Sequence, residues 1–247
     1  YVAGDTSSIG SGDFDVIILK FAPNGSLVDY ITWGGYSTDA ALEIILGTDG
    51  YLYVAGYTRS YNRGYDVVFM KLSRDLDLIF TSIWWTYGDE VPSAITYIND
   101  MYFLVGWSKT AGDIDKDVLL LCFSSNGDLI WYNIWGGPGD DVANYLRAND
   151  KGYLFLVGYS NSFQANDTDL LLAYFDWNGN NQGFITYDYI GDDHGNDVVL
   201  LNDTLYVIGD SYNSTNGYYD AFFVSLGLSL NVTFIHQFSF LALDHLF

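Results

Sequence analysis

The side chains best suited to chemistry in this chain are acidic residues that stand shortly before apolar segments. They are Asp39, Asp89, Glu90, Asp140, Asp141, Asp192, Asp193 and Asp197. Because Ca²⁺ prefers carboxylate oxygens, one hypothesis is a calcium site where these loops meet. The alternative is structural: Asp39, Asp141 and Asp197 are interpreted as sharing one position of a sequence repeat, and an aspartate in a turn accepts backbone hydrogen bonds. We expect these three to fix turns, and we predict no resident metal and no cofactor.

Two further segments have some of the spacing of calcium-binding loops. Asp113-Ile114-Asp115-Lys116-Asp117 alternates aspartates but lacks the glycine and the distant glutamate of such loops. Asn166-Asp167-Thr168-Asp169 stands at the same place in its own repeat. Both are interpreted as variable, solvated loops. Calcium is therefore expected to add little to the stability of the fold.

Histidine is the residue type that most often performs acid–base catalysis, and the chain has three: His194, His236 and His245. They are too scattered to predict a zinc site. His194 alone has close acidic neighbours, Asp192 and Asp193, so a hydrolase or lyase using this group is one alternative. Serine is abundant, but none lies in the strand-to-helix turn of a serine hydrolase. No catalytic residue is predicted.

Aromatic residues in the loops offer a second alternative, because aromatic rings stack on sugars. They are Tyr36, Tyr61, Tyr87, Trp107 and Trp177. Packing between repeats is the competing interpretation. A carbohydrate- or calcium-binding module therefore remains open beside the enzyme.

Composition excludes some partners and favours others. Nine Lys and Arg against 31 Asp and Glu give a net charge of −22, which disfavours nucleic acid and anionic membranes. No stretch is apolar enough for a membrane span. Glycosylation sequons occur at Asn24, Asn166, Asn202, Asn213 and Asn231, which predict an extracellular or cell-surface glycoprotein. The single cysteine, Cys122, lies in an apolar run and is expected to be buried.

A repeat of about 51 residues organises the whole chain. Motifs of the type Tyr-Val-Ala-Gly end at Gly4, Gly56, Gly106, Gly158 and Gly209, and an aspartate opens an apolar run at Asp15, Asp66, Asp117, Asp169 and Asp220. Two marks with one period indicate a solenoid or a propeller. The composition contains no linker, so residues 1–247 are predicted to form a single domain.

One copy of the repeat predicts four strands, at residues 39–46, 51–57, 66–72 and 77–85. Asn-Gly pairs at Asn24-Gly25, Asn126-Gly127 and Asn178-Gly179 predict tight turns between the third and fourth strands, and such turns require antiparallel neighbours. Four antiparallel strands in about 51 residues are typical of a propeller blade. The first copy lacks a first strand, and residues 239–247 are predicted to supply it. The sequence thus predicts an all-β propeller of five blades, closed by pairing of the two chain ends.

These motifs resemble the bacterial and archaeal propeller repeats often labelled SBBP. The resemblance rests on Tyr53-Val54-Ala55-Gly56-Tyr57-Thr58, on Asp66 to Lys71, and on Trp33-Gly34-Gly35 and Trp135-Gly136-Gly137. Later copies depart from it, with Tyr189-Ile190-Gly191 taken as the counterpart of Trp-Gly-Gly. The resemblance implies an exported propeller and brings no catalytic residues. The leading hypothesis is a non-catalytic structural or interaction module, with a protein or glycan partner at the cell surface and with self-association into an assembly as one form of that role.

Overall fold

The chain consists of antiparallel β-sheets in a computed structural model that describes residues 1–62, 64–110, 114–163, 165, 167–188, 191–213 and 217–238. The described residues contain no helix, so none of them forms a helix able to cross a membrane. The chain divides into two compact units, residues 1–135 and 136–247, and each is described separately.

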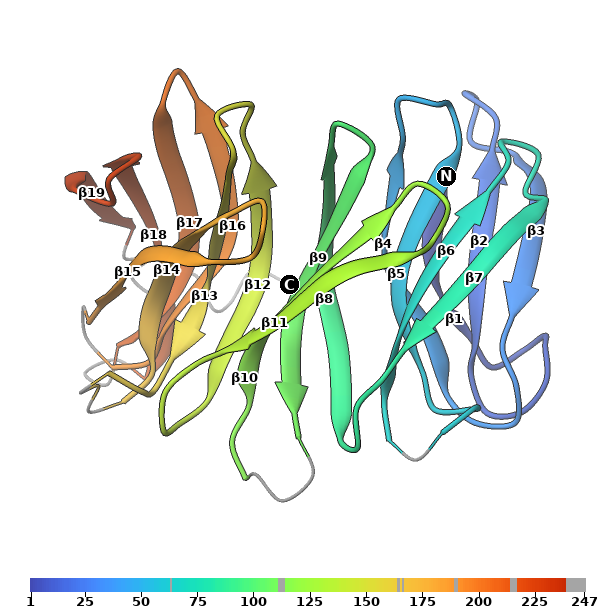
Figure 1. The fold of residues 1–247 in the computed structure, drawn as a ribbon, viewed down its shortest axis with the longest axis horizontal. Coiled ribbons are helices and arrows are strands. Elements are labelled where there is room, and N and C mark those ends of the chain that lie inside the picture. The colour runs from blue at the N-terminus through green and yellow to red at the C-terminus, as the bar shows by residue number, and fades with distance from the viewer. Residues whose placement is uncertain are drawn as a thin grey trace. The chain divides into compact units, whose positions relative to one another are not determined.

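The first unit holds three sheets, each with its strands in sequence order (Figure 1). They are β1 (Val2–Thr6), β2 (Asp15–Phe21) and β3 (Leu27–Trp33); β4 (Asp39–Leu46), β5 (Leu52–Thr58), β6 (Asp66–Leu72) and β7 (Leu78–Trp84); and β8 (Asp89–Ile98), β9 (Met101–Lys109), β10 (Asp117–Ser124) and β11 (Leu129–Trp135). The predicted all-β class is confirmed, and the predicted strand bounds in the second copy agree to within one residue.

The second unit holds two four-stranded sheets of the same order. They are β12 (Asp141–Ala148), β13 (Tyr153–Ser160), β14 (Asp169–Asp176) and β15 (Asn181–Tyr187); and β16 (Asp193–Leu201), β17 (Thr204–Asn213), β18 (Tyr218–Gly227) and β19 (Val232–Phe238). Residues 239–247, predicted to complete the first sheet, lie outside the described residues, so closure of the ring stays a prediction. That sheet has three described strands.

Within each unit the core lies between successive sheets, and the middle strands bury both of their faces. On β5, Val54 packs toward one neighbouring sheet, in a cluster with Val16 and Ile18, whereas Tyr53 packs toward the other, in a cluster with Leu104. Side chains alternate along a strand, so burial on both faces explains why these segments read as continuous apolar runs. An equivalent cluster fills the second unit, between β13 and β14 on one side and β17 and β18 on the other.

The repeated glycine occupies a place where a backbone carbonyl comes too close for any side chain. A Cβ atom at Gly56, Gly106 or Gly158 would lie 2.1, 2.0 or 1.9 Å from the carbonyl oxygen of Ala40, Val91 or Val142. Each of these oxygens belongs to the first strand of its sheet, next to a β-bulge that shifts the register. At Gly4, by contrast, no atom described lies within 4 Å of such a Cβ.

In the turns between third and fourth strands the glycines of the Asn-Gly pairs have the predicted positive φ, whereas the asparagines are not among the residues with positive φ. Gly25, Gly127 and Gly179 have φ of 83°, 86° and 82°. In the other two copies leucine stands at this position with positive φ: Leu76 at 66° and Leu230 at 58°. Both leucines are 5% exposed and belong to the hydrophobic clusters. Burial of a large side chain therefore offsets the backbone strain there.

Candidate functional site

The acidic residues singled out in the sequence form a row across the end of each complete sheet. The ladder pairs an acid on the first strand with a hydroxyl on the second, and that hydroxyl residue with an aspartate on the third. The rows are Asp39–Thr58–Asp66, Glu90–Ser108–Asp117, Asp141–Ser160–Asp169 and Asp193–Ser211–Asp220. The hydroxyl stands two residues after the repeated glycine. Sequence reasoning did not assign it a role, although the Gly-x-Thr motif carries it.

Hydrogen bonds show that the first-strand acid has a structural task. Asp39 is fully buried, and its carboxylate accepts the N–H of Gly35 at 2.7 Å and the hydroxyls of Thr58 and Ser60. Asp141 likewise accepts the N–H of Gly137 at 2.6 Å. Each carboxylate thereby holds the loop that enters its own strand. The structural interpretation of Asp39 and Asp141 is confirmed.

The prediction that Asp197 shares one repeat position with Asp39 and Asp141 is wrong. The ladder pairs Asp193 with Ser211, just as it pairs Asp39 with Thr58, so Asp193 is the counterpart of Asp39. Asp197 pairs with Ile208 beyond the bulge, and its carboxylate lies 3.9 Å from the guanidinium of Arg147. The error arose because both residues are aspartates near the start of one strand, and only the cross-strand pairing, Asp193 with Ser211 and Asp197 with Ile208, distinguishes them.

The same residues also tie neighbouring sheets together within each unit. The N–H of Asp39, Glu90 and Asp193 donates to the carbonyl of Phe14, Tyr65 and Thr168, at 2.7, 2.7 and 2.6 Å. The carboxylates of Asp89 and Asp192 accept the N–H of Tyr65 and Thr168 at 3.0 and 3.1 Å. These contacts bring each first-strand acid close to the third-strand aspartate of the preceding sheet.

Two third-strand aspartates have perturbed acidities as a result. Burial raises the pKa of Asp66 to about 6, with Asn62 opposing the rise and the charges of Glu90 and Asp89 adding to it. Within the described part of the chain, no hydrogen bond of 3.5 Å or less reaches either carboxylate oxygen of Asp66. Burial also raises the pKa of Asp169 to about 6, assisted by Asp188, Asp167 and Asp193. Carboxylates of like charge that lie this close favour a proton or a cation.

His194 lies on β16 but does not use the neighbours expected from the sequence. Its Nδ1 atom lies 3.1 Å from the carboxylate of Asp210, which also accepts an amide hydrogen bond from Asn196 at 2.6 Å. The register pairs His194 with Asp210 across β16 and β17, whereas the side chain of Asp193 is buried. The predicted pairing with Asp192 or Asp193 is therefore wrong. A carboxylate that orients an imidazole is an arrangement capable of acid–base chemistry.

The loop aromatics differ widely in exposure. Tyr36 is 94% exposed, Tyr87 is 87% exposed and Tyr61 is 54% exposed. Trp107 is partly buried and its ring is covered by the ammonium of Lys116, and Trp177 is also partly buried. Tyr36 and Tyr87 therefore offer the most ring surface to a ligand, whereas Tyr61 stacks on Trp33 at 5.6 Å and Trp107 is covered by Lys116.

The predicted glycosylation sites lie at the surface wherever their side chains are described. Asn24, Asn202 and Asn231 are exposed, in or beside turns between strands. Asn213 ends β17, where a long loop was expected, and Asn166 lies outside the described residues. Cys122 is fully buried as expected, and burial raises the pKa of its thiol to about 12.

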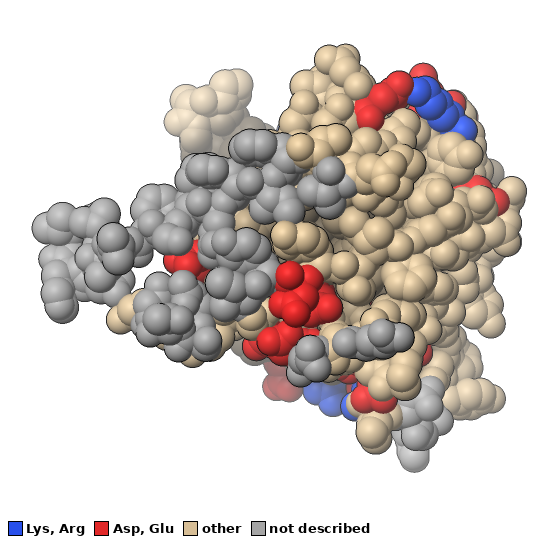
Figure 2. Space-filling model, turned by 90° about the vertical axis from the view of Figure 1, so that its left-hand side faces the viewer, with Lys and Arg blue, Asp and Glu red and all other residues tan. Residues whose placement is uncertain are grey.

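Acidic side chains dominate the charged surface. In the space-filling view Asp and Glu form patches, while Lys and Arg are few (Figure 2). The described ion pairs hold the basic residues Lys20, Lys71, Arg147 and Lys151. The pairs of Lys20 and Lys71 join a strand to a turn, whereas the pair of Lys151 with Asp203 joins the turns of two neighbouring sheets.

Comparison with solved structures supports the propeller class. The chain has a TM-score of 0.50 to a periplasmic gluconolactonase of Pseudomonas aeruginosa, with 11% identity over 91% of this chain and 77% of that one. It has a TM-score of 0.50 to Drosophila Plexin A in complex with Semaphorin 1b, with 10% identity over 87% of this chain and 49% of that one. A candidate 6-phosphogluconolactonase of Bacteroides uniformis also scores 0.50, with 10% identity over 91% and 67%.

At these identities the likeness concerns the fold alone. No family model and no curated protein matches the chain. The solved structures include a gluconolactonase and a protein in complex with a partner protein, so the fold by itself does not decide between catalysis and binding.

Proposed function

We propose that this protein is a non-catalytic structural module outside the cell that associates with other copies of itself through the outer strands of its sheets. The observation that carries the proposal is a row of exposed apolar residues on these strands. Val28, Ile79 and Ile130 occupy the same position of β3, β7 and β11 and are 56%, 53% and 52% exposed. Each follows a leucine that is itself more than a third exposed: Leu27, Leu78 and Leu129.

Outer strands of this kind are uncommon on proteins that remain alone. A strand at the edge of a sheet presents backbone groups to which another strand can pair, and proteins normally protect such edges with lysine or proline. The strands β3, β7 and β11 contain neither residue type. Apolar side chains beside a pairing-competent edge favour strand addition by a second protein. The polar residues at the other candidate positions are mostly engaged in holding turns, which supports a structural role over a catalytic one.

Sedimentation velocity on a concentration series tests this function. We expect the native chain to associate between about 10 and 100 µM, in the range of weak interfaces, and the Ile79→Lys, Ile130→Lys variant to remain monomeric with an unchanged melting temperature. The matched control is the Tyr36→Lys, Tyr87→Lys variant. These two tyrosines are more exposed than Ile79 and Ile130 and lie away from the strand edges, so this variant should associate like the native chain. A native chain that is monomeric at the highest concentration contradicts the proposal.

A carbohydrate-binding function is the second candidate, and it rests on Tyr36 and Tyr87. These two residues are 51 positions apart, occupy equivalent loops and are almost fully exposed. Trp85 lies beside Tyr87 with its ring edge-on at 6.2 Å. Binding on a glycan array that the Tyr36→Lys, Tyr87→Lys variant loses, while the Ile79→Lys, Ile130→Lys variant keeps it, would favour this function over self-association.

The closed five-blade ring belongs to the same proposal, because a structural module benefits from having no open inner edge. If residues 239–247 pair with β1, a carbonyl oxygen should approach Gly4 as it approaches Gly158. Gly4→Ala should then lower the free energy of unfolding about as much as Gly158→Ala, by roughly 3 kcal/mol. Urea denaturation measures both. A Gly4→Ala variant as stable as the native chain would show that no strand lies there.

A further inference from the structure

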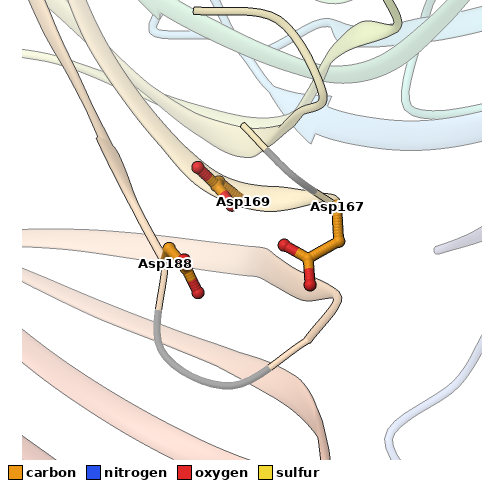
Figure 3. Close-up of side chains that lie close together, drawn as sticks. All are labelled: Asp167, Asp169 and Asp188. Atoms are coloured by element: carbon orange, nitrogen blue, oxygen red, sulfur yellow. The ribbon is translucent and has the colours of Figure 1, made fainter. Parts of the chain in front are cut away.

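A group of three aspartates in the second unit is arranged unlike any other acidic group among the described residues. Asp169 opens β14, Asp167 stands two residues before it, and Asp188 directly follows β15. The ligand oxygens of the three lie within 4.8 Å of one another. The register explains this proximity: Leu170 pairs with Tyr187, so the next residues along the two antiparallel strands, Asp169 and Asp188, face each other. Figure 3 shows the three side chains lying close together.

The third carboxylate is a departure from the repeat. Tyr187 pairs with Leu170 as Trp33 pairs with Val16, so Tyr187 is the structural counterpart of the tryptophan in Trp-Gly-Gly, and the alignment through Tyr189 is wrong. Asp188 therefore stands where the first sheet has Gly34. A Cβ at Gly34 would lie 2.0 Å from a carboxylate oxygen of Asp15, the counterpart of Asp169. The sheet of β12 to β15 thus places an acid where the sheet of β1 to β3 has a glycine.

The buried carboxylate of Asp169 forms no ion pair with any described residue. It is 5% exposed, and its Oδ1 atom has no hydrogen-bond partner in the described part of the chain. Oδ1 of Asp167 is buried and equally without a partner. None of the ion pairs formed by described residues includes any of the three aspartates. Three carboxylates brought together, one of them nearly fully buried, are strongly unfavourable as anions unless a proton or a cation compensates their charge.

We infer that Asp167, Asp169 and Asp188 bind one divalent cation, and that the cation is Ca²⁺. The donor set consists of carboxylate oxygens with no imidazole or thiolate, which suits a hard cation and disfavours zinc. Ca²⁺ accepts irregular sets of six to eight oxygens, so carbonyls and water can complete its coordination around ligands from a loop and two strand ends. Mg²⁺ demands a stricter octahedron and keeps more of its water. This site is distinct from the strand edges that carry the proposed self-association.

Isothermal titration calorimetry on the full chain, after dialysis against EDTA and then against metal-free buffer, tests the site. We expect one Ca²⁺ per chain with a Kd at or below about 1 mM, within the range of extracellular calcium modules. The melting temperature should rise with CaCl₂ and saturate, since the cation stabilises the folded state by mass action. NaCl at matched ionic strength should not reproduce the saturation.

The Asp167→Asn, Asp188→Asn variant should lose at least 90% of the calcium affinity. It should also melt at or above the native chain in EDTA, because two of the three clustered charges are removed. The Asp13→Asn, Asp150→Asn variant makes the same change in net charge at exposed positions and should bind like the native chain. No saturable binding by the native chain, or full binding by the Asp167→Asn, Asp188→Asn variant, overturns the site. Tighter binding of Mg²⁺ than of Ca²⁺ overturns the choice of cation.

Discussion

Alanine at position 158 is expected to lower the free energy of unfolding by about 3 kcal/mol or more. The added Cβ would meet the carbonyl oxygen of Val142 at 1.9 Å, its carbonyl carbon at 2.9 Å and Cα of Ala143 at 3.0 Å. All three atoms are backbone, so no side chain can rotate away. Relief requires β12 and β13 to separate at the bulge, which breaks the ladder between them.

Urea denaturation of Gly158→Ala measures the effect, and Gly227→Ala is the matched control. Gly227 lies at the end of β18 in the same unit, has no atom of the described residues within 4 Å of a Cβ position and is not among the glycines with positive φ. Its replacement should change the stability by less than about 1 kcal/mol. Equal effects of the two substitutions would show that the repeated glycine is not required by close approach.

Asp66 is expected to make the fold less stable as the pH rises from about 4 to about 6. Its pKa rises from 3.8 to about 6 on folding, so the folded chain holds the proton more tightly than the unfolded chain between these values. Stability due to this group is therefore complete below pH 4 and is lost as the pH passes through 6. The difference of about 2 units corresponds to roughly 3 kcal/mol, at 1.36 kcal/mol per unit.

The Asp66→Asn variant should lack this loss and be more stable than the native chain at pH 7, by up to about 3 kcal/mol. Urea denaturation in EDTA at intervals between pH 4 and 7 gives both profiles. Asp13→Asn, which removes an exposed carboxylate of the same unit, should run parallel to the native chain. If the stability of the Asp66→Asn variant changes with pH in the same way as that of the native chain, then Asp66 does not carry the predicted proton.

Much of the fold was predictable from the sequence because local chemistry repeats. The period in the glycines and aspartates predicts four-stranded units, and the Asn-Gly pairs predict where the chain reverses. These signals depend on one or two neighbouring residues, such as the positive φ of Gly127. Burial of Cys122 and the structural role of Asp39 were predictable for the same reason.

Register across strands was the part that the sequence could not decide. Two aspartates near the start of one strand cannot be told apart without their pairing partners, so Asp197 was taken for the counterpart of Asp39 although the ladder assigns that place to Asp193. Pairing between β16 and β17 gives His194 the partner Asp210, sixteen residues away, in place of its chain neighbours.

The same limit concealed the three-aspartate site. By itself the sequence determined the strands, the turns and the number of repeats, since these follow from hydrophobic alternation and from turn chemistry along the chain. Only the tertiary structure decided which charges meet. Asp167 and Asp188 are 21 positions apart and share no local pattern, yet the β14–β15 ladder sets Asp188 beside Asp169, with Asp167 within reach of both. Carboxylates interact through space over a few ångströms, and that distance is determined by strand pairing.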